Sequence, residues 1–273
     1  MKTRPVLSNA TRKLTHDVEV MDERGRTSTI AIPAEQPLTI FVDKRELVTL
    51  MTLGGAPEAL TLGYLRNQRL VDQLEDIVSV QVDWEVEAAA VVTRKGIRSL
   101  AERAAHQTMT TGSGAEASVF GGLMDEVDAI VLAPQARLKQ STLLGIIETV
   151  RTHRSIYKQA GSLHGCALFS AGGELIYFTE DVGRHNAVDA IAGKMWLDDI
   201  RGDDKIFYTT GRLTSEMVMK GAQMGIPFLL SRSGATQMGH RVAERLNMSL
   251  FARCSGRHFL LLSGFGRFIH DQA

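Results

Sequence analysis

The chain has 273 residues, of which 44% are hydrophobic and 23% charged, so it is long enough to bury a large core in one domain or two. Lys plus Arg and Asp plus Glu both number 31, which leaves no net charge to attract nucleic acid or an anionic membrane. No apolar run could span a bilayer, and the N-terminus lacks the apolar core of a signal peptide. We therefore expect a cytoplasmic protein without nucleic-acid or membrane partners.

The first half of the chain is typical of an α+β unit. The first forty residues show weak periodicity and predict a partly mobile start, with one strand from Thr27 to Ile32. A helix, two paired strands and a second helix follow in this order: Pro57 to about Leu70, Val78 to Val86, Ala88 to Thr93, and Ile97 to His106. The Gly/Ser/Thr-rich stretch from His106 to Gly122 is then a loop or linker.

The second half alternates strands and helices and predicts an α/β layer. Ser141 and Thr142 are expected to cap its first helix. The later elements are a hairpin of Ala167–Ser170 with Leu175–Phe178, helices at Arg184–Trp196, Thr214–Met224 and Thr236–Leu246, and strands at Ile206–Thr209, Pro227–Leu230, Leu250–Ala252 and Phe259–Leu262. The tail after Gly264 is expected to fray. The predicted fold is α/β, with an N-terminal α+β domain (1–107), a linker (108–135) and a larger C-terminal α/β domain (136–273).

The stretch from Tyr177 to Asp189, which reads YFTEDVGRHNAVD, concentrates functional groups between a strand and a helix start. It supplies two acidic acceptors, a guanidinium, an imidazole that titrates near neutral pH, and a side-chain amide. These are Glu180, Asp181, Arg184, His185 and Asn186. A charged turn closed by a salt bridge is the alternative interpretation.

Two later junctions repeat the arrangement of strand, polar loop and helix. They are Gly211-Arg212-Leu213-Thr214-Ser215-Glu216 and Ser231-Arg232-Ser233-Gly234-Ala235-Thr236. Each exposes unpaired N–H groups at a positive helix end, and each adds an arginine and hydroxyls, so the pair predicts a diphosphate site. Helix capping by Thr214, Ser215 and Thr236 is the structural alternative and is compatible with binding.

Together these three segments closely resemble the FdhD/NarQ family of formate dehydrogenase accessory proteins, and the resemblance extends from about Phe41 to Gly264. It implies a cytidine-deaminase-like C-terminal domain, a homodimer, and a pocket for molybdopterin guanine dinucleotide, with GDP as a fragment mimic. It also implies formate dehydrogenase as client and a cysteine desulfurase as sulfur donor. His164 matches a family histidine near the pocket, and the weaker match at Arg253-Cys254-Ser255-Gly256-Arg257-His258 corresponds to a segment that contacts the cofactor.

The chain departs from the family pattern at the step of sulfur transfer. Relatives carry a CxxC motif in a mobile loop whose thiol accepts sulfur as a persulfide, whereas the corresponding loop here, Thr110 to Gly122, has no cysteine. A hydroxyl cannot form the exchangeable S–S bond, so Ser113 and Ser118 do not replace the thiol. We therefore expect a cofactor-binding accessory protein whose sulfur step is lost, delegated to a cysteine-bearing paralogue, or moved to another thiol.

Three alternatives are weighed against this expectation, and the second of them fails on its residues. The first is an active sulfurtransferase that works through Cys166 or Cys254, which are the only cysteines and have no disulfide or zinc spacing. The second, a zinc deaminase, lacks the PCxxC pair that such enzymes need. The third is a nucleotide-responsive regulator without a cofactor role.

Overall fold

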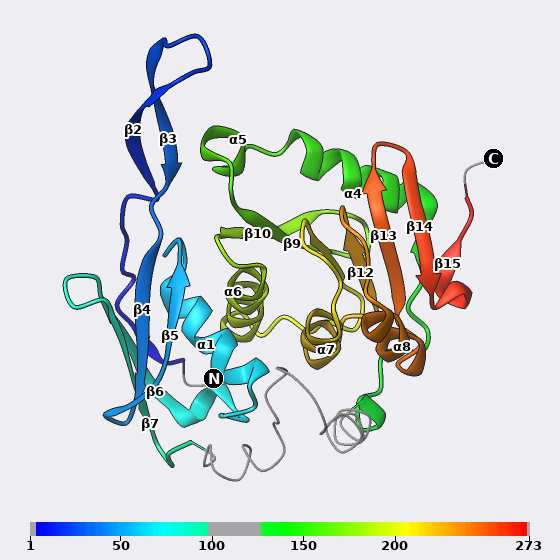
Figure 1. Cartoon of the computed structure of the whole chain (residues 1–273). Coiled ribbons are helices and arrows are strands. Elements are labelled where there is room, and N and C mark those ends of the chain that lie inside the picture. Colours follow the sequence, from blue (N-terminus) through cyan, green and yellow to red (C-terminus); the bar gives the residue numbers. More distant parts are fainter. Residues whose placement is uncertain (1–3, 98–126, 272–273) are drawn as a thin grey trace, which may run out of the picture.

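The structure is a computed structural model that describes residues 4–97 and 127–271. Its N-terminal half contains a five-stranded sheet and a protruding two-stranded hairpin of β2 (Thr15–Met21) and β3 (Thr27–Pro33) (Figure 1). The sheet has the order β1 (Val6–Leu7), β6 (Ile77–Asp83), β7 (Ala88–Thr93), β4 (Gln36–Val42) and β5 (Arg45–Thr52). Helix α1 (Pro57–Asn67) and the 3-10 turn η1 (Leu74–Asp76) pack their apolar side chains on one face of it.

The C-terminal half is a three-layer unit around a six-stranded sheet (Figure 1). The strand order is β10 (Leu175–Asp181), β9 (His164–Phe169), β11 (Ile206–Thr209), β12 (Phe228–Ser231), β13 (Ser249–Ser255) and β14 (His258–Ser263). One face packs on α6 (Arg184–Leu197), α7 (Ser215–Gln223) and α8 (Gln237–Arg245). The other packs on α4 (Gln140–Thr152), which the short α5 (Tyr157–Ala160) follows. Alternate residues along each strand therefore enter two separate cores.

Helices α1 and α6 join the two halves through a glycine crossing. A Cβ added to Gly63 would lie 1.7 Å from the Asp189 carbonyl oxygen, and one added to Gly193 would lie 1.9 Å from the Ala59 carbonyl oxygen. No side chain fits at either position. The backbones of the two helices are consequently in direct contact.

A buried ion pair lies below this crossing. Lys220 Nζ on α7 is 2.9 Å from Asp189 Oδ2 on α6, and the two side chains are 5% and 2% exposed. Asn67 at the end of α1 donates its amide to the other Asp189 oxygen at 2.7 Å. Burial raises the pKa of Asp189, whereas the Lys220 ammonium opposes that rise. Three helices are thus tied at one carboxylate, which needs both partners because a buried charge is costly when unpaired.

The mixed α/β class and most of the predicted elements are confirmed. β3, β7, the β9–β10 hairpin, α6 and the alternation from β11 to β14 fall where the pattern placed them, within a few residues at each end. Val188 and Ile191 of α6 are fully buried. The helix expected at 97–106 and the loop at 106–122 lie almost wholly outside the described residues, and so does the predicted boundary at 107, which stays a prediction.

Three expectations were wrong. The first forty residues contain more than the one expected strand, because β1 pairs with β6 and β2 pairs with β3 before β4 begins. The tail after Gly264 does not fray, since β15 (Phe268–Ile269) pairs with β8 (Leu138–Lys139) and the Phe268 ring packs against Phe251. Ser141 is not a cap but lies inside the first turn of α4, where its N–H donates to Asp271 at 2.9 Å.

No helix among residues 4–97 and 127–271 is both long enough and apolar enough to cross a bilayer.

Candidate functional site at one end of the six-stranded sheet

The predicted site segments all meet at one end of the six-stranded sheet (Figure 1). β11, β12 and β13 are parallel, so the loops that follow them leave from the same edge. β9 is antiparallel to β11, which brings its first residue, His164, to that edge. β10 is antiparallel to β9 and ends there at Asp181, just before α6 begins. This edge is where ligands bind in many open α/β sheets.

Hydrogen bonds hold the neighbouring loops in register. Arg232 N donates to the Thr209 carbonyl at 3.1 Å, and Ser231 Oγ donates to the Gly211 carbonyl at 2.6 Å. Arg253 N in turn donates to the Ser233 carbonyl at 2.8 Å. The loops after β11, β12 and β13 therefore form one continuous surface.

The helix starts at this surface are capped by threonines. Thr214 accepts from Met217 N at 3.5 Å at the start of α7, and Thr236 accepts from Gly239 N at 3.2 Å at the start of α8. Capping is thus confirmed for these two residues, whereas Ser215 is the first residue of α7 rather than its cap. Both positive helix ends point toward the same edge of the sheet and favour an anion there.

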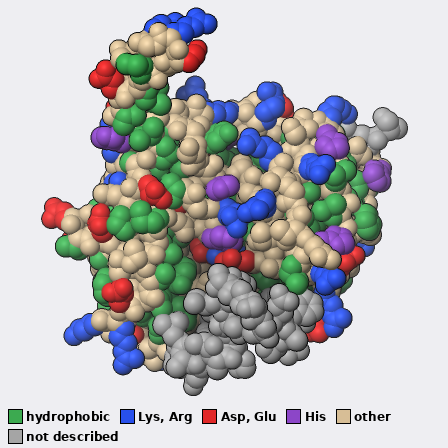
Figure 2. All heavy atoms as spheres, viewed as in Figure 1, with side chains coloured by type: hydrophobic (Ala, Val, Ile, Leu, Met, Phe, Trp, Pro, Cys, Tyr) green, Lys and Arg blue, Asp and Glu red, His purple; other side chains and the backbone are tan. Residues whose placement is uncertain are grey.

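Arg184 and His185 stand at the start of α6 beside these loops. A Cβ on Gly211 would lie 2.9 Å from Arg184 Cδ, so the glycine lets the arginine side chain lie against the loop backbone. Within the described ranges, the buried Arg184 Nε has no hydrogen-bond partner. Figure 2 shows basic and histidine side chains gathered near the start of α6. Among the described residues, the arrangement leaves one guanidinium donor unsatisfied at the start of α6.

His185 is a neutral imidazole at physiological pH. Burial lowers its pKa to about 4, although Glu216, whose carboxylate is 3.4 Å from Nδ1, works against that shift. His164 is also affected, because burial and the Arg184 charge lower its pKa. Its Nδ1 is 3.5 Å from Thr210 Oγ1. Both imidazoles can therefore accept or donate a hydrogen bond without adding positive charge.

Asp181 and Asn186 point into the protein and tie the two halves together. Asp181 is 5% exposed and accepts from Thr52 Oγ1 at 2.5 Å and from Asn186 Nδ2 at 2.9 Å. Asn186 Nδ2 also donates to the Met51 carbonyl at 2.7 Å. Burial raises the pKa of Asp181, and these hydrogen bonds oppose the rise. Both side chains hold β5 against the start of α6, so the contribution we assign to them is positioning.

A cavity of about 220 Å³ opens beside the same edge, between α5 and the ends of β10, β12 and β13. Five predicted residues line it: Glu180, Arg232, Cys254, Ser255 and Gly256. Glu180 also accepts the N–H groups of Ile156 at 2.6 Å and Tyr157 at 3.0 Å, which fixes α5 as one wall. The Arg232 guanidinium carbon lies 5.7 Å from the centroid of the Tyr157 ring.

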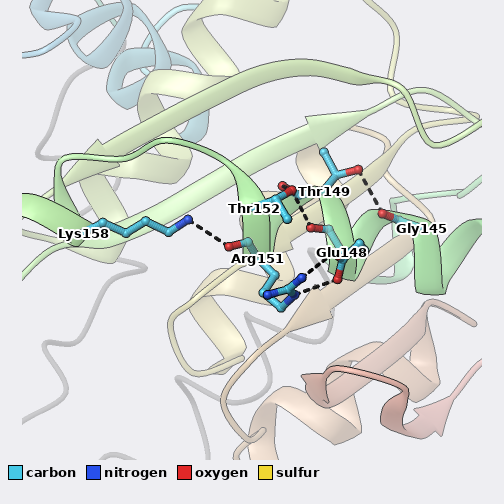
Figure 3. A network of polar contacts seen from close by, with 6 residues as sticks. All are labelled: Gly145, Glu148, Thr149, Arg151, Thr152 and Lys158. Atoms are coloured by element: carbon cyan, nitrogen blue, oxygen red, sulfur yellow. Dashed lines mark hydrogen bonds and ion pairs between the residues drawn. The ribbon is translucent and has the colours of Figure 1, made fainter.

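Arg151 and Lys158 also line this cavity, and they make polar contacts at the C-terminal end of α4 (Figure 3). Arg151 makes a bidentate pair with Glu148, and Lys158 Nζ donates to the Arg151 carbonyl at 2.9 Å. Thr149 and Thr152 hydroxyls return to backbone carbonyls of α4. The wall therefore carries the Lys158 ammonium and an Arg151 guanidinium that Glu148 neutralises, and its own hydrogen bonds hold it in place.

Sequence reasoning missed several cavity residues, among them Tyr157, Lys158 and Tyr208, and it gave no role to Phe178, which lies within the Tyr177–Asp189 stretch. Arg212, Arg253 and His258 lie at the same sheet edge as exposed side chains, outside the cavity lining, and so does Arg257, which has contacts of its own. Tyr157 carries no spacing signal, because α5 is one turn long and its position is set by Glu180.

The two thiols are buried. Burial raises the pKa of Cys166 to about 12 and that of Cys254 to about 12. Cys166 lies within β9, where its Sγ contacts Thr209 Oγ1 at 3.4 Å, and Cys254 faces the cavity from β13. Neither is a thiolate at neutral pH, which is the form that attacks sulfur. Among the described residues no group of three or more His, Cys, Asp or Glu is placed to hold a metal ion.

The sequence matches one family and two relatives that carry the same name. The sequence model of the FdhD/NarQ family matches residues 33–269. The chain is 30% identical over 239 residues to the sulfur carrier protein FdhD of Listeria innocua, which covers 87% of this chain and 91% of that protein. It is 28% identical over 249 residues to the protein of the same name from Sulfurisphaera tokodaii, covering 89% and 94%.

The fold also matches a solved structure. A crystal structure described as a formate dehydrogenase accessory protein from Desulfotalea psychrophila superposes with a TM-score of 0.74 at 25% identity. The match covers 93% of this chain and 98% of that one. The likeness therefore includes both halves of the molecule.

Proposed function

Because the chain belongs to the FdhD/NarQ family, we propose that it is a formate dehydrogenase accessory protein that binds molybdopterin guanine dinucleotide and supports its sulfuration or insertion. The observation that carries the proposal is the meeting of three arginine-bearing segments at one sheet edge, with two capped helix starts between them. Backbone N–H groups and guanidinium forks are the donors that a diphosphate requires.

The residues fit such a cofactor in charge and in donor type. Arg184 Nε is a buried donor to which the described part of the chain offers no partner, and Arg232 borders the cavity. A cavity of about 220 Å³ is below the usual range for a whole drug-sized ligand. It would take one part of the nucleotide, such as the base beside Tyr157, while the diphosphate lies over the loops. When bound, the cofactor supplies the metal to which sulfur is delivered.

In this proposal the protein presents the cofactor and another protein supplies the thiol. The loop from Thr110 to Gly122 has no cysteine, and the pKa of both thiols is raised to about 12. A cysteine desulfurase would then pass its sulfur through a cysteine-bearing partner. Burial of both thiols argues against the alternative of an active sulfurtransferase that uses Cys166 or Cys254.

Calorimetry with GDP tests the site. Arg212→Ala and Arg232→Ala should each weaken binding by about 1.5–3 kcal/mol, the usual contribution of a hydrogen bond to a charged group, or roughly 10- to 150-fold in Kd. Arg241→Ala is the matched control, since Arg241 is an exposed arginine within α8 and belongs neither to the two loops nor to the cavity lining. Unchanged affinity in both site variants would remove these loops from the nucleotide site.

A second experiment separates a cofactor carrier from a nucleotide-responsive regulator. The wild-type chain and the two site variants are introduced into cells that lack their own accessory protein, and formate dehydrogenase activity is measured. The carrier role predicts restored activity with wild type and the Arg241→Ala control, and reduced activity with the site variants. Full activity with the site variants, despite lost GDP binding, would favour the regulator.

A further inference from the structure

A second cavity, of about 390 Å³, lies at the opposite end of the six-stranded sheet from the candidate site. It is bordered by the loop that leads into β11 at Ile206, whereas the candidate site follows the other end of that strand at Thr209. Its walls come from α1, the last turns of α6 and α7, and two loops at 131–133 and 199–203. The volume lies within the usual range for a small-molecule site.

Arg66 of α1 gives this cavity a positively charged group. Its Nη1 donates to the Ala192 carbonyl of α6 at 3.2 Å, and its guanidinium carbon is 5.8 Å from the centroid of the Trp196 ring. Burial lowers the pKa of Arg66, and no carboxylate within the described ranges pairs with it. A guanidinium carries five N–H donors and stays charged at physiological pH. Hydrogen bonds within the described ranges use one of these donors, so Arg66 has others to offer to an anion.

Gln223 at the end of α7 gives the cavity an acceptor. Its Oε1 is buried and has no hydrogen-bond partner among the described residues. A buried polar group without a partner is costly, so such an atom marks a place where a donor is expected. The C-terminal ends of α6 and α7 both border this cavity, and they carry partial negative charge. A positively charged donor is therefore favoured over a neutral one.

An apolar wall completes the cavity, and backbone contacts hold it. Met195, Trp196 and Ile200 line this side, and Ile200 N donates to the Met195 carbonyl at 2.9 Å. A Cβ added to Gly202 would lie 2.1 Å from the Met224 carbonyl oxygen, so the loop before β11 packs directly on the end of α7. The cavity is therefore formed before a ligand arrives, which lowers the entropy cost of binding.

We propose that this cavity binds a free α-amino acid with an apolar side chain. The carboxylate accepts from the open donors of Arg66, because a guanidinium fork matches two carboxylate oxygens. The ammonium donates to Gln223 Oε1 at the negative end of α7. A zwitterion fits because Arg201 and Asp203, which pair at 3.5 Å in the lining, add no net charge that would favour an anion or a cation. The inference does not rest on the proposed function.

Calorimetry with L-leucine and matched analogues tests the class of ligand. Isocaproate has the carbon skeleton of leucine without the amine, and isoamylamine has the same apolar group and amine without the carboxylate. L-Leucine should bind with a Kd below about 1 mM, and each analogue should bind at least roughly 10-fold more weakly, because a hydrogen bond to a charged group is lost. N-Acetyl-L-leucine amide, which imitates a peptide segment, should also bind more weakly.

Substitutions test the two polar groups and the cavity itself. Arg66→Gln and Gln223→Leu should each raise the Kd for L-leucine roughly 10- to 150-fold. Arg241→Gln, at an exposed position on α8 outside this lining, is the control and should bind like wild type. Val131→Trp should block the cavity without unfolding the protein, since Val131 lines it and is 87% exposed. Val86→Trp is the control for that change, because Val86 is 69% exposed and lies outside the lining.

Several outcomes would overturn the proposal. A Kd for L-leucine above about 1 mM would exclude the amino acid. Equal binding of isocaproate or isoamylamine would exclude the zwitterion, and tighter binding of N-acetyl-L-leucine amide would assign the cavity to a peptide segment instead. Wild-type affinity in Val131→Trp would place leucine elsewhere on the protein. GDP affinity should stay unchanged in Arg66→Gln and Val131→Trp, so this test and that of the nucleotide site can fail independently.

Discussion

The glycine crossing of α1 and α6 gives the sharpest prediction about stability. Gly63 and Gly193 each lie in the interior of a helix, where alanine is normally favoured by about 1 kcal/mol. Here a Cβ would meet a backbone carbonyl oxygen at 1.7 Å and 1.9 Å, whereas real Cβ contacts stay above 3.0 Å. Backbone atoms cannot rotate away as a side chain can. The two helices would have to separate by 1.3 Å and 1.1 Å, the differences between these distances.

Such a separation would loosen the core on both sides of the crossing. Overpacking of a well-packed core costs about 1–3 kcal/mol, and this exceeds the gain in helix propensity. Because these contacts are with backbone atoms, we take the upper end of that range, about 3 kcal/mol, which less about 1 kcal/mol of helix propensity leaves a loss of about 2 kcal/mol in the free energy of unfolding for each of Gly63→Ala and Gly193→Ala. The double variant should cost less than the sum of the two, because one separation of the helices relieves both contacts.

Gly145→Ala is the matched control for this prediction. Gly145 lies within α4, and a Cβ there would meet no atom within 4 Å. It should stabilise the protein by about 0.5–1 kcal/mol. Urea unfolding followed by circular dichroism and by tryptophan fluorescence measures all four variants and shows whether the transition is two-state. If Gly63→Ala and Gly193→Ala were as stable as Gly145→Ala, the close crossing would be refuted.

Three further predictions concern the buried groups. Lys220→Met should lower the free energy of unfolding by about 3–5 kcal/mol, because it leaves the Asp189 carboxylate unpaired. Urea unfolding should show that adding Asp189→Leu restores part of that free energy. No recovery in the double variant would contradict the pairing. Because the pKa of His185 falls from 6.5 to about 4 on folding, the unfolded state binds the extra proton between these values. The melting temperature should therefore drop as pH falls through that window, and it should drop less in His185→Gln. Equal slopes of melting temperature against pH in the two proteins would exclude His185 as the cause. After incubation with a cysteine desulfurase, cyanide-labile sulfur should be absent, and the Cys166→Ala, Cys254→Ala double variant should support formate dehydrogenase like wild type. Stoichiometric sulfur on wild type alone would show that the chemistry has moved to one of these thiols.

Local sequence patterns predicted the elements that are buried on a regular period. Helix α6 was located because Val188 and Ile191 repeat on one face, and β11 and β12 were located because short apolar runs end in polar loops. The diphosphate site was predicted from the repeat of strand, polar loop and helix start, whereas the shared sheet edge came from the parallel pairing of β11, β12 and β13. Thr214 and Thr236 were likewise readable as caps, because capping depends on neighbours two or three residues away.

Other features depended on partners distant in the sequence. Asp181 looks like a ligand group in the motif, but Thr52, 129 residues earlier, accounts for one of its oxygens. Glu180 similarly anchors α5 through two N–H groups upstream of it. Nothing within a few residues of either acid indicates these contacts, because an isolated carboxylate in a sequence does not specify which donor will reach it.

The sequence by itself determined the alternation of strands and helices, the polar loops between them, and the absence of a thiol from the loop at 110–122. Only the tertiary structure decided which of those polar side chains are free for a ligand. Arg184 Nε has no partner among the described residues, while Asp181 and Asn186 are used to join the two halves. The reason is physical: residue type and period record burial and chain direction, whereas the availability of a polar group depends on every atom that folding brings within hydrogen-bond distance.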